Sequence, residues 1–212
     1  LRAPPPALKA VGAAVLLALL ALPWAVDAQS YTLVLMVDLV IAALFATSLH
    51  FLMGPAGLHS FGPAAFFGLG AYGAALLLNA AGLPMLWALL LAPLLAALGG
   101  VLTGWFAVRL TGVYFSMLTL AFAQIIWATT FQWDSVTGGS NGLTGVWPAA
   151  WLEDKRWFYL LTLLLATAGV LALWRVLYAP PGYALGARRH APLRAHASGI
   201  AGAQLPGMGS VL

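Results

Sequence analysis

Six long apolar segments with almost no charge constrain the fold of this chain more than any other feature. A helix rises about 1.5 Å per residue, so about 20 apolar residues cross the hydrocarbon core of a bilayer. Five segments reach that length comfortably, whereas the third is short and rich in glycine. The runs are continuous rather than alternating, which favours helices over a barrel. The segments cover residues 8–26, 32–53, 63–80, 84–108, 113–133 and 157–177.

The composition places the chain among integral membrane proteins. Of its 212 residues 63% are hydrophobic and 7% are charged, whereas a soluble domain carries about 25% charged residues. Too few polar groups are present to cover a surface in water. We therefore predict an all-α integral membrane protein with about six transmembrane helices, the third of them tilted, re-entrant or broken. Residues 1–212 then form a single transmembrane domain.

Composition also limits the chemistry that the chain can perform. Cysteine is absent, which excludes disulfides, thiolate catalysis and cysteine-based metal sites. The four histidines lack the HxxxH and HExxH spacings of zinc sites, so we expect no bound metal. The net charge of +4 is explained by basic residues on one side of the membrane, so nucleic acid is not an expected partner.

Basic residues predict the orientation of the spans. With a cytoplasmic N-terminus and six spans, only Lys155 and Arg156 lie outside, next to Glu153 and Asp154. The other seven of the nine Lys and Arg residues lie inside, so the positive-inside rule predicts a cytoplasmic C-terminal segment. These seven are Arg2, Lys9, Arg109, Arg175, Arg188, Arg189 and Arg194.

The first apolar segment has two interpretations. Its basic start, the apolar run 11–22 and the triplet 26–28 are typical of a cleaved signal peptide. Pro23 and Trp24 crowd the cleavage region and another span follows at once, which favours a retained helix. Cleavage would leave five spans and the same cytoplasmic C-terminal segment, so charge does not separate the two interpretations.

Small residues cluster in the third and fourth segments. Without large side chains, helices approach closely and gain van der Waals contact. We therefore predict that these positions pack helix against helix, in a tight bundle or at a subunit interface. They are Gly68, Gly70 and Gly73 in the third segment, and Ala96, Gly100 and Gly104 in the fourth.

Polar candidates lie in the fifth segment and in the loop that follows it. Gln124 is placed mid-span with Thr119 on the same helix, and a buried amide must find partners. It either lines a pore or joins two helices. The loop is rich in turn-forming residues whose amides and hydroxyls can line a polar site, the alternative being a solvated turn. Its candidates are Thr137, Gly138, Gly139, Ser140 and Asn141.

A basic segment, residues 179–200, follows the last span. It carries Arg188, Arg189 and Arg194, and no acidic residue occurs from Lys155 to the end of the sequence. Such a segment cannot enter lipid. It is therefore expected to be a cytoplasmic element that another protein contacts.

Three segments together resemble the permease subunits of branched-chain amino acid ABC transporters, particularly the longer of the two permease types. Residues 54–77, GPAGLHSFGPAAFFGLGAYGAALL, are similar to the family pattern GYAGQxSLGHAAFFGIGAYTAALL. Residues 108–124, VRLTGVYFSMLTLAFAQ, lead into TGGSNGLTG with the family's spacing. Residues 179–200 are similar to SPFGRALRAIRENPLRAEALGI without a gap. The resemblance covers most of residues 47–200.

The resemblance implies a subunit that performs no chemistry itself. It implies a second permease, two cytoplasmic ATPases that bind ATP and magnesium, and a periplasmic protein that delivers leucine, isoleucine, valine or a related solute. The location implied is the bacterial inner membrane, and this chain binds no cofactor. Outer-loop residues would meet the delivering protein or the substrate entrance. The coupling helix that docks on an ATPase would use Gly182, Leu185, Arg188, Arg189, Leu193, Arg194 and Gly199.

The sequence departs from the family pattern at several polar positions. Leu58 and Pro63 stand where the family usually has Gln and His. In the coupling segment, the length and the three arginines are kept while other charges are lost. Family members also continue through further spans after this segment, so the chain is expected to be C-terminally incomplete. The lost charges are two Arg, replaced by Tyr183 and Gly186, and two Glu, replaced by His190 and His196.

The sequence is also compatible with two other functions. A secondary transporter or channel would need no ATPase, but it would need an intramembrane coupling site, for which the sequence offers only Asp38. A truncated, non-transporting membrane scaffold would need no substrate path. Within the transporter reading, urea and short amides are the alternative substrates, because relatives with this pattern also carry them.

Overall fold

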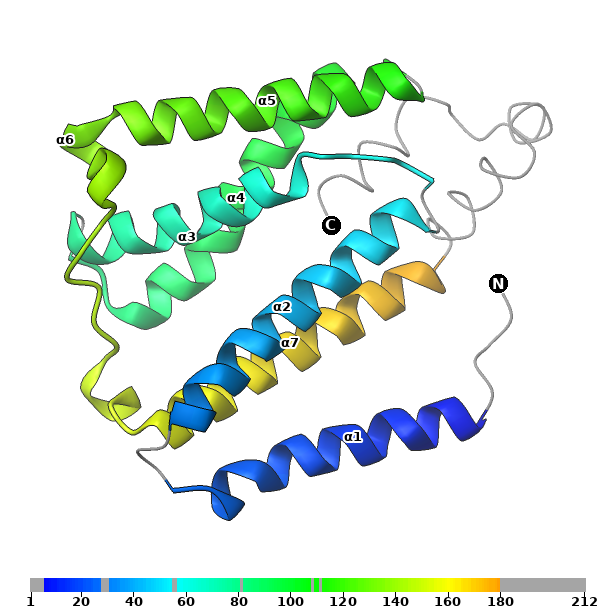
Figure 1. The fold of residues 1–212 in the computed structure, drawn as a ribbon, viewed down its shortest axis with the longest axis vertical. Coiled ribbons are helices and arrows are strands. Elements are labelled where there is room, and N and C mark those ends of the chain that lie inside the picture. Colours follow the sequence, from blue (N-terminus) through cyan, green and yellow to red (C-terminus); the bar gives the residue numbers. More distant parts are fainter. Residues whose placement is uncertain are drawn as a thin grey trace. The chain divides into compact units, whose positions relative to one another are not determined.

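The computed structural model describes residues 6–27, 31–54, 57–80, 82–107, 109–110 and 112–179, and these residues form helices and loops without a strand (Figure 1). Each of the six apolar segments is a helix, so the predicted all-α membrane fold is confirmed. The long helices are α1 (Pro6–Ala25), α2 (Tyr31–Met53), α3 (Pro63–Asn79), α4 (Met85–Ala107), α5 (Val113–Gln132) and α7 (Lys155–Leu177). The short ones are α6 (Asp134–Thr137), η1 (Gly139–Asn141) and η2 (Ala150–Leu152).

Four helices, α2, α4, α5 and α7, are long and apolar enough to cross a membrane. Two further apolar helical stretches are shorter. They are Ala10–Ala25, within α1, and Pro63–Asn79, which is α3. The 17 residues of α3 extend about 25 Å, less than the roughly 30 Å of a hydrocarbon core. The third segment is therefore short, as predicted, and it is one continuous helix and not a broken one.

The chain divides into two compact units, which we describe separately. Among the described residues, unit 1 comprises α1, α2 as far as Ser48, η2 and α7. Unit 2 comprises residues 49–148, and therefore α3, α4, α5, α6 and η1.

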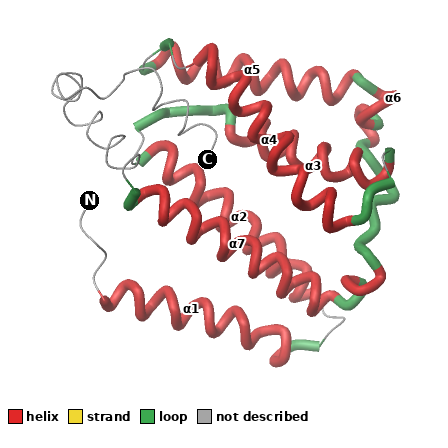
Figure 2. The backbone as a smooth tube through the Cα atoms, turned by 180° about the vertical axis from the view of Figure 1, so that it is seen from behind, coloured by secondary structure: helices red, strands yellow, loops and turns green. Residues whose placement is uncertain are grey.

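Within unit 2, α3 and α4 form a closely packed antiparallel hairpin (Figure 2). A Cβ atom built on Gly70 would lie 3.5 Å from the Cβ of Ala96, and one on Gly73 would lie 2.9 Å from Leu95 Cδ1. A side chain at Gly73 would therefore crowd Leu95, whereas one at Gly70 would make ordinary van der Waals contact with α4. By contrast, a Cβ on Gly68 would meet no atom within 4 Å. On α4, Gly100 and Gly104 are buried.

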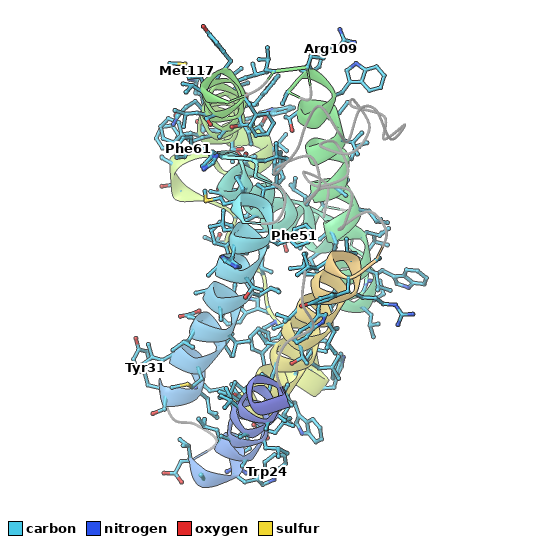
Figure 3. The ribbon with its side chains drawn as sticks, turned by 90° about the vertical axis from the view of Figure 1, so that its right-hand side faces the viewer. Trp24, Tyr31, Phe51, Phe61, Arg109 and Met117 are labelled. Atoms are coloured by element: carbon cyan, nitrogen blue, oxygen red, sulfur yellow. The ribbon has the colours of Figure 1, made fainter. Side chains whose placement is uncertain are left out.

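The four membrane-length helices leave most of their apolar surface uncovered. In the 18-residue apolar stretch of each of these helices, only 11% to 17% of the residues are buried within the described chain. Large side chains are exposed at helix ends, such as Trp24 near the end of α1 and Tyr31 at the start of α2 (Figure 3). A helix that is apolar on all sides is typical of a membrane span, so these surfaces are suited to lipid or to other transmembrane helices.

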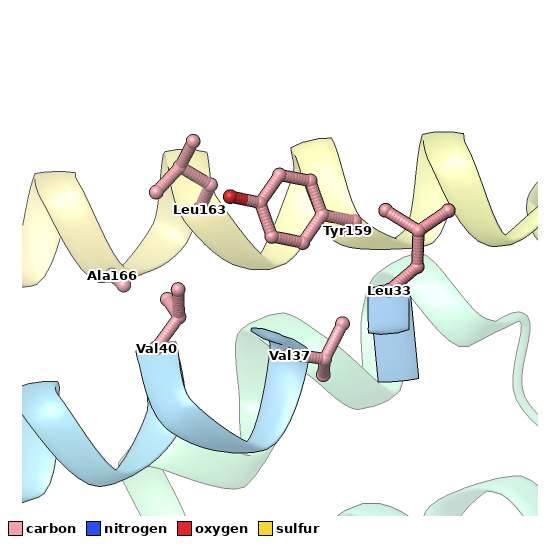
Figure 4. Packing of buried hydrophobic residues seen from close by; sticks show 6 residues of the cluster. All are labelled: Leu33, Val37, Val40, Tyr159, Leu163 and Ala166. Carbon is pink, nitrogen blue, oxygen red and sulfur yellow. The ribbon is translucent and has the colours of Figure 1, made fainter. Parts of the chain in front are cut away.

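In unit 1, α2 and α7 lie side by side and share a small core (Figure 4). Each helix contributes three residues at the spacing i, i+4, i+7, which places them on one face. Tyr159 is fully buried at the centre of this contact, and Leu19 and Leu22 of α1 pack against it. The six core residues are Leu33, Val37, Val40, Tyr159, Leu163 and Ala166.

Candidate functional site

A groove of about 360 Å³ lies within unit 2, between α3 and α5. Its volume is at the lower end of small-molecule pockets, which hold roughly 300–1,000 Å³. From α3 it is lined by Ala64, Ala65, Gly68 and Tyr72, and from α5 by Leu120, Ala123, Gln124, Ile126, Trp127, Thr130 and Phe131. Phe61 and Gly139, from the loops at either end, complete the lining.

The shape of the groove follows from the side chains of its two walls. On α5, Leu120, Gln124, Trp127 and Phe131 recur at intervals of three or four residues, which places them on one face of the helix. On α3, the small residues at positions 64, 65 and 68 leave the space that this aromatic face does not fill. The lining of α5 from residue 120 to residue 131 corresponds to about 16 Å of helix.

The groove is apolar and uncharged. Among the residues that the structure describes, its polar side chains are Tyr72, Gln124 and Thr130, and none of the lining residues is charged. Thr130 Oγ1 donates a 2.8 Å hydrogen bond to the carbonyl of Ile126, so that hydroxyl is already used. The Tyr72 hydroxyl and the Gln124 amide form no hydrogen bond with the described part of the chain, and Gln124 is exposed. The groove therefore suits an apolar body that also meets one or two neutral polar groups.

One end of the groove is closed by the loop of residues 57–62, which α5 holds in place with two hydroxyls. Ser116 Oγ donates to the carbonyl of His59, and Thr119 Oγ1 accepts a 3.2 Å hydrogen bond from the backbone N–H of Phe61. Both side chains are buried, as is Ser60. Pro63 then begins α3, where the fixed φ of proline suits the first helical position.

The other end is closed by a compact loop after α5. Thr137 Oγ1 lies 2.8 Å from the Trp133 carbonyl, to which it donates, and it accepts from the N–H of Gly139 at 3.4 Å. Gly138 has a φ of 72°, and a Cβ atom there would lie 2.3 Å from the Gly142 carbonyl oxygen, so only glycine fits. Asn79 Nδ2 donates to the Thr144 carbonyl at 3.1 Å, which joins the end of α3 to this loop.

The polar residues predicted for a substrate path lie at different places in the structure, and only some of them line the groove. Gln124 and Gly139 line the groove, whereas Thr119 is buried behind Phe61 and its hydroxyl is bound to backbone. Thr137 and Gly138 shape the loop after α5. Ser140 and Asn141 are exposed on that loop. The predicted coupling residues Gly182, Leu185, Arg188, Arg189, Leu193, Arg194 and Gly199 lie outside the described residues.

Sequence reasoning missed the aromatic residues of the groove. Trp127 and Phe131 follow Gln124 at helical spacing, so that pattern was available in the sequence. Phe61 and Tyr72 come from other segments and carry no comparable signal. In the part of the chain that the structure describes, no group of three or more His, Cys, Asp or Glu residues could hold a metal ion.

Comparison with known proteins points to one family. The model of the permease component of branched-chain amino acid transport systems matches residues 31–205. The high-affinity branched-chain amino acid transport system permease protein LivM of Escherichia coli (strain K12) is 32% identical over 132 residues, which cover 62% of this chain and 31% of the relative. LivM of Salmonella typhimurium is 36% identical over 98 residues, or 46% of this chain and 23% of the relative. The chain thus aligns with less than a third of the length of each of these curated relatives. No solved structure matches it.

Proposed function

Because the chain belongs to the family of branched-chain amino acid transport permeases, we propose that it is a membrane-spanning permease subunit of an ATP-driven importer of branched-chain or other hydrophobic amino acids. The family match over residues 31–205 carries this proposal. It includes α2, α3, α4, α5 and α7, and therefore both walls of the groove and both loops that close it.

In this proposal the groove between α3 and α5 forms part of the translocation path. Its apolar lining and its position along α5, a helix of membrane length, support that assignment. Gln124 supplies a neutral hydrogen-bonding side chain within the path. The chain performs no chemistry of its own, and ATP hydrolysis takes place in partner subunits.

The proposed partners are a second permease subunit, two cytoplasmic ATPases and a periplasmic binding protein. Residues 179–200 would contact an ATPase on the cytoplasmic side of a bacterial inner membrane. The resemblance of this segment to the family's coupling helix supports the assignment, as does the distribution of Lys and Arg along the sequence.

Co-purification tests the proposal. The tagged chain is expressed with the second permease and the ATPases, extracted in mild detergent, and assayed for bound ATPase. Replacing Arg188, Arg189 and Arg194 together by Glu should abolish ATPase binding, whereas replacing all three by Lys, which keeps the charge, should retain it. Failure of the unaltered chain to bind any ATPase would overturn the ABC-transporter assignment. It would favour an ATP-independent transporter or a non-transporting scaffold.

One observation supports a second class of substrate. None of the described residues that line the groove is charged, so none of them pairs with an ammonium or a carboxylate group. Urea and short amides need neutral hydrogen-bonding groups, such as Gln124 and Tyr72. Competition between labelled leucine and unlabelled acetamide in the uptake assay distinguishes the two classes.

A further inference from the structure

We propose that Phe61, positioned by the hydroxyl of Thr119, determines which side chains the groove accepts. This inference rests on the proposed function, since it concerns the selectivity of the same groove. Phe61 would act as the wall that limits the size of the bound side chain. Thr119 would act as a positioning residue, because it contacts the backbone of Phe61 and not the groove.

The first step of the argument concerns the backbone of Phe61. Its N–H donates to Thr119 Oγ1 at 3.2 Å, and two residues earlier the His59 carbonyl accepts from Ser116 Oγ. Ser116 and Thr119 are one turn apart on α5, and Thr119 Oγ1 also donates to the Ser116 carbonyl at 2.9 Å. The loop is thus attached to α5 at two points by buried hydroxyls. Without Thr119 Oγ1, the N–H of Phe61 would lose its acceptor.

The second step concerns the ring of Phe61. The backbone of this residue is attached to α5, yet 59% of its surface is exposed and it lines the groove. The ring is therefore presented to the open space rather than packed in a core. Its nearest lining neighbours along the chain are Ala64 and Ala65, which are too small to replace it as a wall. Removing the ring would lengthen the groove at this end.

The third step concerns the class of ligand. Aromatic and aliphatic side chains surround the groove, and its neutral polar groups are Tyr72, Gln124 and Thr130. A charged side chain would find no partner of opposite charge among the described residues that line the groove. An aliphatic side chain needs no such partner, and it gains contact with the apolar walls. The groove is thus expected to accept leucine-like side chains, to reject lysine and glutamate, and to exclude side chains too long for the space that Phe61 leaves.

A single-cysteine reporter tests binding without relying on transport. The chain contains no cysteine, so an Ala123→Cys variant has one reactive thiol, on the groove wall of α5. In the assembled complex in membranes, leucine should slow its reaction with a small maleimide several-fold, and lysine should not. A Met117→Cys variant is the matched control, because Met117 is exposed on α5 but does not line the groove. Its labelling should be unaffected by leucine.

The selectivity is measured as the ratio of protection by leucine to protection by phenylalanine. In the Ala123→Cys background, Phe61→Ala should weaken protection by leucine at least about tenfold relative to protection by phenylalanine, because one methylene group in an apolar pocket already changes discrimination by roughly 10- to 200-fold and this substitution removes a whole ring. Thr119→Val should shift this ratio in the same direction. Thr119→Ser, which keeps the acceptor oxygen, should leave the ratio as it is with Thr119. A purely structural role of Thr119 would lower the amount of folded protein and leave the ratio unchanged.

The outcomes separate this inference from the proposed function. If leucine protects the reporter but the complex does not carry leucine, the transport assignment fails and the inference stands. If the complex carries leucine and Phe61→Ala leaves the ratio unchanged, the inference fails alone. Equal ratios for Thr119→Val and Thr119→Ser would overturn the positioning role, and absence of protection in the unaltered groove would overturn the site.

Discussion

The hydroxyl of Tyr159 donates a 2.9 Å hydrogen bond to the backbone carbonyl of Leu19, a residue 140 positions earlier in the chain. In an α-helix this carbonyl would accept from the N–H four residues later, but that residue is Pro23, which has no N–H. Tyr159 of α7 therefore supplies the donor that α1 lacks. Both Tyr159 and Pro23 are fully buried within unit 1. The contact explains how α1 accommodates a proline in its last turns.

Replacing Tyr159 by Phe should lower the thermal stability of the protein in detergent. The substitution leaves the Leu19 carbonyl without a donor, and hydrogen bonds between membrane helices contribute about 0.6–2 kcal/mol. Retention of the monomer peak on size-exclusion chromatography after heating is the measurement. Tyr114→Phe is the control, because Tyr114 is exposed on α5. Equal melting of the Tyr159 variant and the control would contradict the role assigned to this bond.

The same contact predicts coupling between Tyr159 and Pro23. A Pro23→Ala change restores a backbone N–H at the position that normally bonds to Leu19. Tyr159→Phe should therefore cost less stability in the Pro23→Ala background than in the unaltered chain. A double-mutant cycle measures the difference. Strictly additive effects would show that the missing donor is not what Tyr159 replaces.

Replacing Gly73 by Val should destabilise the hairpin of α3 and α4. A Cβ atom at Gly73 already meets Leu95 Cδ1 at 2.9 Å, so a branched side chain requires the Leu95 side chain or the helices to move. Overpacking of this kind costs about 1–3 kcal/mol. Gly68→Val is the matched control, since it makes the same change on the same helix where a Cβ meets no atom within 4 Å. Equal melting temperatures of the Gly73→Val and Gly68→Val variants would contradict this prediction.

Replacing Gly138 by Ala should disorder the loop after α5 and lower the stability of the protein. The positive φ strains any residue with a Cβ, and the new atom would lie 2.3 Å from the Gly142 carbonyl oxygen. Gly142→Ala separates the two effects, because Gly142 also has a positive φ but an open environment. Limited proteolysis of the loop should be faster in the Gly138 variant. Equal cleavage of both variants would assign the effect to φ alone.

Replacing Asp154 by Ala should weaken the first turn of α7. The Asp154 side chain accepts a 3.0 Å hydrogen bond from the backbone N–H of Arg156, and losing such a cap costs about 0.5–2 kcal/mol. Asp154→Asn keeps the acceptor and should be nearly neutral. Glu153→Ala removes a neighbouring charge without removing the cap. Hydrogen exchange of the first turn of α7 measures the effect, and faster exchange in the Glu153 variant than in the Asp154→Ala variant would contradict it.

The sequence predicted the candidate site only in part, and particular residues show why. Gln124 was identified because an amide in an apolar span is conspicuous, and it lines the groove. Trp127 and Phe131 share its helical face, yet aromatic residues are common in such spans. Phe61 was not identified, because its role depends on a hydrogen bond to a residue 58 positions away. Thr119 was expected in the substrate path, and only its bond to the Phe61 backbone shows that it lies behind the groove.

The sequence alone determined that six segments are apolar helices and that the third is short. Length and hydropathy suffice for this, because a segment in lipid must satisfy its backbone hydrogen bonds internally. Only the tertiary structure decided which faces of those helices meet. The helices are apolar on all sides and lipid is as apolar as a protein core, so hydropathy does not distinguish an inner face from an outer one. The pairs Tyr159–Leu19 and Thr119–Phe61 therefore had to be read from the folded chain.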